Sequence, residues 1–527
     1  MEASNFTIVC NDDGDIVNLI FSKETDATLQ TELCALTNDE RFYDNEVKTT
    51  PEEMTEYIPK IKARFDAGCT CLGELLMVLE DCNIAVNSRY EQMKKDNKVT
   101  FDTLNKLFAI GSKFVTDVNH GKNQIVGSTV TSTHIEVGSY QKRYFCLSGN
   151  FIVATDKKFV NESKQFYIEE FSGLKTVDTL SIRPMTDEAH ALLTERGKQF
   201  AKYGVGCHHI VYSGAMFMET GWGPVYFGAT GRAMTDKLGF DTVNPNYARH
   251  YGQTDGMTEI PDDLLYSTWN TLFGFSFVAK RWGQMFVNCI KDVIYDDCAY
   301  DSLVIDEDRK KIIKALVTKS GTGFTDLISG KSGGTILLFH GDPGTGKTLT
   351  CEAIAELLHV PLYSITAGEL GITPDILEKK LSQILEITVR WNASILLDEA
   401  DIFLEARTSS DILRNAMVGI FLRLLERNAG VIFLTTNRAD SMDPAFKSRI
   451  SMIFEYKNLS HDSRKQVWTN LLKASSCSVP DVDIVALAEY PLNGRQIKNA
   501  IRMAQSLAFD DSEIVTREHL DRIISYV

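Results

Sequence analysis

The stretch LLFHGDPGTGKTLTCEAIAE, residues 337–356, decides how the C-terminal part of this chain is interpreted. Its apolar start has the length of a strand, its end is typical of a helix, and the loop 341–348 between them fits G-x-x-x-x-G-K-[ST] without departure. In that context glycines let backbone N–H groups wrap phosphates, and the start of the helix adds positive potential. Lys347 then supplies a charge for the β- and γ-phosphates, and the Thr348 hydroxyl can ligate Mg²⁺. A glycine-rich turn that binds nothing is the alternative. The residues expected to bind nucleotide are Gly341, Asp342, Pro343, Gly344, Thr345, Gly346, Lys347, Thr348 and Leu349.

A second motif follows, where the apolar run SILL, residues 394–397, ends in two adjacent acids, Asp398 and Glu399. At the end of a strand, Asp398 can hold Mg²⁺ directly or through water, and Glu399 can polarise the attacking water. Two solvated acids at a strand end would look the same in isolation. Because this pair follows a phosphate-binding pattern, it indicates nucleotide hydrolysis.

From about residue 306 strand-like and helix-like segments alternate, which is typical of a parallel α/β sheet. Beyond residue 460 the pattern is helical only, which predicts a small separate lid. The expected strands are 335–340, 362–365, 394–397, 431–434 and 452–456, and the expected helices of the sheet domain are 312–317, 347–358, 374–389 and 411–427.

In these motifs and their order, residues 306–527 resemble the AAA family of ATPases. The segment FLTTNR, residues 433–438, resembles the family's sensor-1 strand, which implies that Asn437 helps to align the attacking water. Arg449, within FKSRI, matches the arginine finger that reaches a neighbouring subunit's nucleotide. Arg495, within NGRQ, matches a sensor-2 arginine that contacts the γ-phosphate. The resemblance implies ATP and Mg²⁺ as cofactors. It also implies Thr348 and Asp398 as metal ligands, and as catalytic residues Glu399, Asn437, Arg449 and Arg495.

Two departures from the family pattern qualify the resemblance. The family's paired arginines near the finger are reduced here to the single Arg449. Many members that thread polypeptide carry an aromatic residue in the pore loop after the second strand, and the corresponding stretch here, residues 367–374, contains none. Threading through a central pore is therefore not implied.

The upstream half divides differently. Residues 1–98 are expected to form an N-terminal segment that is partly helical, and residues 99–243 a β-rich domain with a helix at 186–203. Residues 244–305 are expected to be a linker and a docking segment, and 306–458 and 459–527 the ATPase subdomain and the lid. The β-rich part resembles an uncharacterised module that precedes the ATPase domain in a group of eukaryotic AAA proteins. That likeness is carried by residues 196–198 and 231–236. The fold class is therefore multidomain α/β.

Composition sets the outer limits. A chain of 527 residues with 44% hydrophobic and 24% charged residues has the profile of a soluble multidomain protein. The net charge of −16 predicts no nucleic-acid partner. Without a signal-like start or a span-length apolar run, we expect a soluble intracellular protein with no membrane span, in cytoplasm or nucleus. The clusters Cys69-Cys71-Cys82 and 207–209 lack zinc-site spacing, and buried reduced thiols are the interpretation.

Together these observations predict an enzyme, an ATPase that hydrolyses ATP to ADP and phosphate. We expect it to remodel a protein partner recognised by its N-terminal half, and to work as a homo-oligomeric ring. A nucleotide-controlled assembly scaffold with slow turnover is the alternative.

Overall fold

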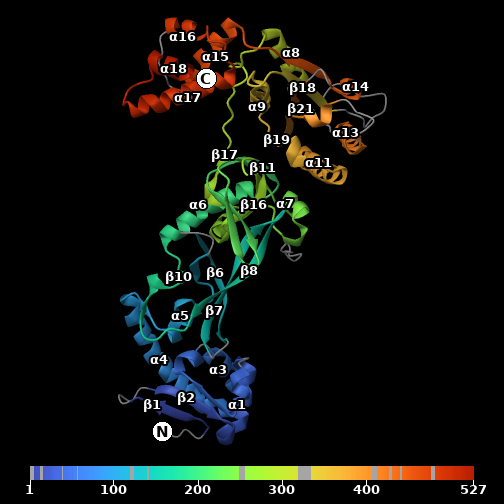
Figure 1. The fold of residues 1–527 in the computed structure, drawn as a ribbon. Coiled ribbons are helices and arrows are strands. Elements are labelled where there is room, and N and C mark those ends of the chain that lie inside the picture. Colours follow the sequence, from blue (N-terminus) through green and yellow to red (C-terminus); the bar gives the residue numbers. More distant parts are fainter. Residues whose placement is uncertain are drawn as a thin grey trace.

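The computed structural model describes residues 5–526, except residues 12–15, 38–39, 56, 119–123, 139–141, 248–255, 319–333, 406–411, 427–429, 439–441 and 476–480. Three parts follow one another along an elongated molecule (Figure 1): an N-terminal unit in blue, a β-rich unit in cyan and green, and a C-terminal unit in orange and red. None of the helices in this described part combines the length and apolar character that a membrane crossing requires.

The N-terminal unit is a small antiparallel sheet packed against helices. Its sheet has the order β1-β2-β3, so the N-terminal segment, expected to be partly helical, also contains strands. Leu72, Leu75 and Leu79 lie at helical spacing around the start of α4 and are fully buried. The elements are β1 (Thr7–Cys10), β2 (Ile16–Ser22), β3 (Glu46–Thr49), α1 (Lys23–Thr37), α2 (Pro51–Thr55), α3 (Ile58–Asp66) and α4 (Gly73–Lys95).

The β-rich unit contains two larger sheets. The first has the order β10-β5-β6-β7-β8 and the second β13-β12-β16-β15-β14-β11-β17. The first is built from β5 (Lys113–Asp117), β6 (Ile125–Val137), β7 (Arg143–Ala154), β8 (Phe159–Glu169) and β10 (Ile182–Pro184). The second is built from β11 (Cys207–Tyr212), β12 (Ala215–Thr220), β13 (Gly223–Gly228), β14 (Gly231–Asp236), β15 (Thr271–Ser276), β16 (Arg281–Phe286) and β17 (Ile290–Asp292).

The expected helix at 186–203 is α6 (Asp187–Tyr203), and the Thr186 hydroxyl caps its first turn. Gly197 allows this helix to lie close to its neighbour, since a Cβ there would sit 2.1 Å from the Leu265 carbonyl oxygen. The adjacent Arg196 is half-buried and donates to the Ile125 and Thr268 carbonyls. The 196–198 motif therefore has a packing role.

One expected boundary is wrong. Residues 244–305 were expected to be linker and docking segment, yet strands β15, β16 and β17 lie inside that range and complete the second sheet. The β-rich unit therefore extends to Asp292. The reason is long-range pairing. Strand β14 pairs with β15, which lies more than thirty residues later in the chain, and Met234 is opposite Phe275.

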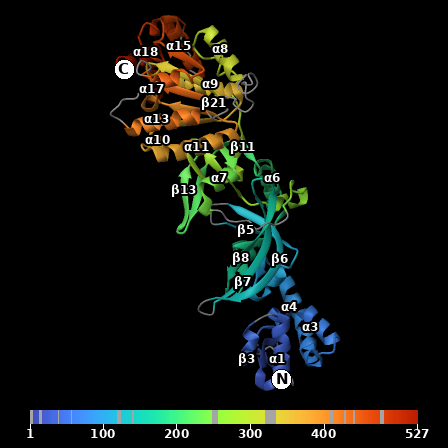
Figure 2. The same cartoon turned by 90° about the vertical axis from the view of Figure 1, so that its right-hand side faces the viewer.

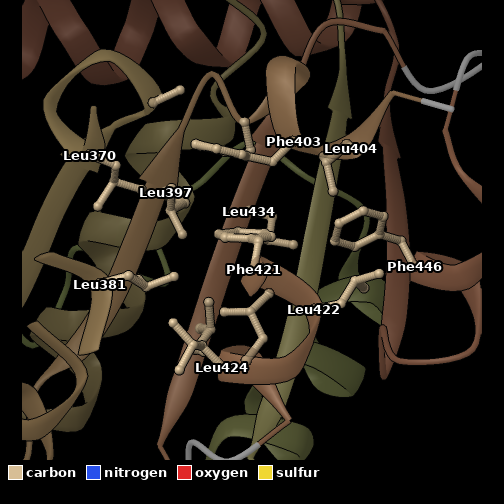
Figure 3. Close-up of a cluster of buried hydrophobic side chains, with 14 of the residues drawn as sticks. Leu370, Leu381, Leu397, Phe403, Leu404, Phe421, Leu422, Leu424, Leu434 and Phe446 are labelled. Carbon is tan, nitrogen blue, oxygen red and sulfur yellow. The ribbon is translucent and has the colours of Figure 1, made fainter. Parts of the chain in front are cut away.

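The C-terminal domain has a five-stranded parallel sheet with the order β19-β20-β21-β18-β22, as the alternating pattern predicted. Helices cover it, and Figure 3 shows the core between Leu397 and Leu434 of the sheet and Phe421 of α13. Its strands are β18 (Thr335–Gly341), β19 (Leu362–Thr366), β20 (Ser394–Asp398), β21 (Val431–Thr436) and β22 (Met452–Tyr456). Its helices are α8 (Glu307–Thr318), α9 (Lys347–Leu358), α10 (Ala367–Leu370), α11 (Pro374–Arg390), α12 (Asp401–Leu404), α13 (Ile412–Leu425) and α14 (Pro444–Lys447).

The helix expected at 411–427 is α13, and both of its expected end residues lie outside the described residues. Beyond β22 the chain is helical in its described part, as expected. The lid consists of α15 (His461–Ala474), α16 (Asp481–Leu487), α17 (Gly494–Asp510) and α18 (Arg517–Ile524).

The β-rich unit docks on the C-terminal sheet domain next to α11 (Figure 2). Asp236 is buried and accepts hydrogen bonds from the Arg390 guanidinium and from Trp391 Nε1, the latter at 2.7 Å. Phe275 stacks on Tyr363 with ring centroids 5.4 Å apart. Most of these contacts lie where β19 and β20 begin, so the edge where the strands end stays available for a site.

The cysteine clusters are only partly as expected. Cys82 is buried, whereas Cys69, Cys71 and Cys207 are half-buried, because they lie near helix and strand ends rather than within a core. The sulfur atoms of Cys69 and Cys71 are 3.3 Å apart.

Candidate nucleotide site

The glycine-rich loop joins β18 to α9 with the backbone geometry that its glycines permit. Gly341, Gly344 and Gly346 have φ of 142°, 80° and 100°, a region that favours glycine. A Cβ at Gly341 would also lie 2.0 Å from the Tyr456 carbonyl oxygen on β22. The loop therefore curls tightly between two parallel strands and delivers Lys347 at the first position of α9.

Lys347 lies at the centre of the site. Its side chain is buried, and its ammonium donates to the carbonyls of Gly341 and Asp342 at 2.7 and 2.8 Å and to Asn437 Oδ1 at 2.9 Å. Burial lowers the pKa of Lys347, and the positive charge of Arg495 acts in the same direction, while nearby carboxylates oppose the shift. The sequence-predicted residues Lys347, Asn437 and Arg495 thus share one environment.

Two oxygen donors lie side by side next to this lysine. Thr348 Oγ1 is 3.3 and 3.4 Å from the two carboxylate oxygens of Asp398. A hydroxyl and a carboxylate are hard ligands of the kind that Mg²⁺ uses together with waters and substrate phosphates. The residues present therefore fit a magnesium ion, and the assignment of Thr348 and Asp398 as its ligands stays a prediction.

Glu399 follows directly after β20. It is exposed, and its φ of 54° is a left-handed value that costs a non-glycine residue about 1 kcal/mol. Its backbone N–H donates to Thr435 Oγ1 at 3.0 Å, which holds the turn. The strained turn carries the carboxylate beyond the end of the strand, beside Asp398.

Sequence reasoning missed the side chains that hold the acids in place. The Thr435 hydroxyl donates to Asp398, the Thr436 hydroxyl donates to Asp401, and the Asn437 N–H donates to Asp401 at 3.2 Å. Asp401 therefore fixes the end of β21 against the turn after β20. The sequence does show two threonines before Asn437, but it does not show that their hydroxyls meet acids that lie far away in the chain.

The lid reaches the loop through the start of α17. Gly494 N donates to the Gly344 carbonyl at 3.0 Å, and Asn493 Nδ2 lies 3.4 Å from the Pro343 carbonyl. The Asn493 side chain also caps α17 by accepting from Gln496 N at 2.9 Å. This contact places Arg495, in the first turn of α17, at the nucleotide loop.

Arg449 is the predicted residue that the structure does not bring to the loop. Its guanidinium donates to Glu426 and, at 2.9 Å, to the Ala445 carbonyl. It lies after α14 and before β22, and its side chain remains about one-third exposed. Leu349 is exposed on the first turn of α9.

The stretch after β19 carries no aromatic residue, and α10 occupies its first part. Ile372 follows α10 and is 84% exposed, so an aliphatic side chain stands in solvent at this point. Lys280 of the β-rich unit pairs with Glu369 of α10 at 2.6 Å.

Comparison with known proteins points to the same part of the chain. Residues 337–458 match the model of the ATPase family associated with various cellular activities (AAA), and residues 89–189 match a domain of unknown function, DUF7025. A protein of Methanothermobacter marburgensis, named as a 26S proteasome regulatory subunit homolog, is 31% identical over 199 residues, which are 35% of this chain and 53% of that protein.

Two further relatives have different names. Proteasome-activating nucleotidase 1 of Haloferax volcanii is 32% identical over 205 residues, 35% of this chain and 49% of its own. CD-NTase-associated protein 6 of Pseudomonas aeruginosa is 27% identical over 263 residues, 42% of this chain and 84% of its own. The chain spans about half the length of the two relatives named for the proteasome.

The matched segment contains the glycine-rich loop, the two adjacent acids and the strand that ends just before Asn437, on a parallel five-stranded sheet. Residues 337–458 are therefore similar to the ATPase domain of the AAA family, both in sequence and in the sheet that carries these groups.

Proposed function

We propose that this protein binds ATP with Mg²⁺ and hydrolyses it to ADP and phosphate. The observation that carries the proposal is the convergence of Lys347, Asp398 and Asn437 at one edge of the sheet, with the Lys347–Asn437 hydrogen bond of 2.9 Å as its centre. Parallel strands deliver their C-terminal ends to the same edge, so the three groups come from β18, β20 and β21 without long loops.

Each group has a separate chemical part. Lys347 and the loop N–H groups neutralise the phosphates, and Thr348 and Asp398 would hold the Mg²⁺, which supplies charge for the transferred phosphoryl group. Glu399 is free to orient water because it projects beyond the strand. Asn437, hydrogen-bonded to Lys347, links water alignment to the phosphate-binding lysine.

We infer further that the cycle remodels a protein partner bound by the N-terminal half, in a homo-oligomeric ring. A cavity of about 550 Å³ in the β-rich unit, lined among others by Lys164, Trp269 and Gln284, supports binding in that half. One relative, proteasome-activating nucleotidase 1 of Haloferax volcanii, is named for its action on another protein assembly. The stretch after β19 exposes the aliphatic Ile372 and contains no aromatic residue. For this reason a slow nucleotide-controlled scaffold stays as the second candidate.

The test compares two variants in binding and turnover. Lys347→Ala should lose ATP binding because the charge for the phosphates is gone. Glu399→Gln should bind ATP normally and lose hydrolysis by about 10²-fold or more, because water activation is removed. ATP affinity is measured by titration with a fluorescent analogue, and turnover by phosphate release.

Unchanged ATP affinity in Lys347→Ala would refute the phosphate assignment. The two candidate functions separate on the steady-state rate. A remodeller should turn over steadily and respond to its partner, which Glu399→Gln held in ATP should capture. A scaffold should assemble with ATP and turn over slowly whatever is added.

A further inference from the structure

A separate group of chemically active side chains lies on the first sheet of the β-rich unit, remote from the nucleotide loop. His134 and Glu136 belong to β6, and Cys146 belongs to β7. The antiparallel register sets His134 directly opposite Cys146, with Glu136 two residues further along the same face. Register alone therefore brings three different donor types together.

The opposite face of the same strands faces the core. Phe145 and Leu147 are fully or almost fully buried in the hydrophobic core, and Ile135 packs against it. Because side chains alternate across a strand, His134, Glu136 and Cys146 all point to the outer face. Cys146 is nevertheless completely buried, while His134 and Glu136 are exposed. The thiol is thus shielded from solvent, while the imidazole and the carboxylate reach it.

The donor atoms of the three side chains, one each, lie within 4.8 Å of one another. The Cys146 sulfur is 3.5 Å from Glu136 Oε2. Tetrahedral Zn²⁺ binds sulfur at about 2.3 Å and nitrogen or oxygen at about 2.0–2.2 Å, which sets its ligands about 3.5 Å apart. Small rotations of the exposed His134 and Glu136 side chains would bring the donor atoms from a separation of up to 4.8 Å to the separation that zinc ligands have.

We propose that His134, Glu136 and Cys146 bind one zinc ion through nitrogen, oxygen and sulfur. Three protein ligands leave a fourth position for water. Binding exchanges the thiol proton of Cys146, released to solvent, for the metal–sulfur bond, with no change of oxidation state. The mixture of thiolate, imidazole and carboxylate favours zinc over magnesium or calcium, which prefer oxygen ligands alone.

The surroundings suit such a site. Lys142 and Arg143, the nearest cations in sequence, are paired with Glu169 and Glu170 and do not compete for Glu136. On the neighbouring strand β8, Gln165 Nε2 lies 3.4 Å from His134 Nε2, so an amide is available to orient the ring.

The position also gives the ion a structural consequence. The adjacent Arg143 forms an ion pair with Glu53 of α2, so this end of the β6–β7 pair carries the contact with the N-terminal unit. A metal that joins β6 to β7 here would stiffen the strands at that junction.

The experiment uses the full chain without nucleotide and Co²⁺ as a spectroscopic substitute for Zn²⁺. Titration should produce a thiolate-to-cobalt charge-transfer band that saturates at one equivalent and disappears when Zn²⁺ is added. Cys146→Ser should abolish the band. His134→Ala and Glu136→Gln should each weaken cobalt affinity by about 10-fold or more, at least what loss of an outer partner costs. Cys298→Ser, which removes an exposed thiol elsewhere, is the matched control and should retain the band.

A second readout covers the case in which a variant folds poorly. Zn²⁺ should raise the melting temperature of the wild type and of Cys298→Ser, but not of Glu136→Gln at the same metal concentration, because a ligand that binds only the folded state stabilises it. A missing charge-transfer band in the folded wild type would overturn the proposal. So would a band that survives Cys146→Ser, because another thiol would then be the ligand.

Discussion

Thr435 illustrates how one side chain sets the geometry of two acids. Its hydroxyl donates to Asp398 and accepts from the Glu399 N–H, so the proposed metal ligand and the proposed water-orienting residue are tied to one atom of the neighbouring strand. A hydroxyl can do both because it is donor and acceptor at once. Valine has the same shape and could do neither.

His209 is a second residue whose environment has a measurable effect. It lies in β11 at the docking face, where its Nδ1 is 2.8 Å from the Tyr295 hydroxyl and its ring packs against Phe277. Burial lowers the pKa of His209 from 6.5 to about 4, and the charge of Arg232 acts in the same direction. The folded protein therefore resists a proton that the unfolded chain accepts.

We expect this histidine to make the protein acid-sensitive. Its stabilising contribution is complete above pH 6.5 and is lost as the pH falls toward 4, because only the unfolded state binds the proton in that window. His209→Gln should reduce the fall in unfolding free energy between pH 7 and pH 4.5 by roughly 1–2 kcal/mol. Tyr295→Phe is the control and should keep the wild-type slope, since burial is the main cause. Denaturant unfolding at several pH values measures both, and parallel curves for wild type and His209→Gln would contradict the assignment.

Among the elements, α17 connects lid and nucleotide loop most directly. Its capping box uses the Asn493 side chain for Gln496 N and the Gln496 side chain for Asn493 N. The same asparagine contacts the Pro343 carbonyl, and the next residue donates to Gly344. The start of the helix is therefore held by its own cap and by the loop together.

The two roles of Asn493 can be separated by substitution. Asn493→Ala should destabilise α17 by about 1 kcal/mol, because the cap is lost. Asn493→Ser should recover most of that stability, since serine also caps, but it is too short to reach Pro343. We expect both variants to show weaker ATP binding, measured by titration, while thermal unfolding separates them. Wild-type ATP affinity in the serine variant would show that the contact with Pro343 does not matter for binding.

The elements of the C-terminal domain could be predicted closely from the sequence. Its central strands β18, β20 and β21 are buried on both faces and are therefore short apolar runs. Helix 347–358 was predicted with the bounds of α9. The end of the second sheet could not be located in this way. Phe273 and Phe275 alternate as strand residues do, but their partners, such as Met234, lie far back in the chain. Local pattern cannot reveal such pairing.

In the candidate site, too, local motifs could be predicted and contacts between distant strands could not. Lys347, Thr348 and Asp398 come together as the motifs predicted, because each motif fixes its own loop at the end of a strand. Thr435 and Asp401 were not predicted, since their roles arise only when β20 and β21 lie side by side. The zinc ligands were missed for that reason too.

On the scale of the whole molecule, the docking of the β-rich unit depends on Asp236. Its carboxylate caps Gly239 N at 2.8 Å within its own unit and accepts from Arg390 and Trp391 of the other. Its near-complete burial means that loss of the carboxylate leaves these three donors without their partner.

Asp236→Ala should therefore cost about 3 kcal/mol, the lower end of the range for breaking a buried pair, because Arg390 keeps some solvent access. Calorimetry should show the β-rich unit and the ATPase domain melting more independently. Lys280→Ala, which removes an exposed pair across the same boundary, is the control and should cost less than about 1 kcal/mol. Equal effects of the two substitutions would show that Asp236 does not hold the units together.

Arg449 raises the question of how many subunits build one active site. Its guanidinium bonds Glu426 and the Ala445 carbonyl, and among the described residues it forms no hydrogen bond with the loop 341–348. An arginine that stabilises the developing charge of phosphoryl transfer must approach the γ-phosphate, and such fingers are worth about 10³ to 10⁵ in rate. The contacts of Arg449 within one chain do not provide that approach, which favours action on a neighbouring subunit.

Arg449→Ala should accordingly bind ATP almost normally and hydrolyse it poorly, by at least about 10³-fold if the finger has its usual value. Mixing gives the sharper result. Subunits carrying Arg449→Ala keep an intact loop, and subunits carrying Lys347→Ala keep an intact arginine, so co-assembly creates some interfaces with both. Phosphate release should then recover in the mixture, although each variant alone is inactive.

The control is a mixture of Arg449→Ala with the double variant Lys347→Ala/Arg449→Ala, which co-assembles without any intact finger and should stay inactive. If the first mixture also stays inactive despite confirmed co-assembly, Arg449 acts within its own chain or only in structure. A monomer with full activity would exclude a shared site altogether, because no second chain would be present to supply the arginine.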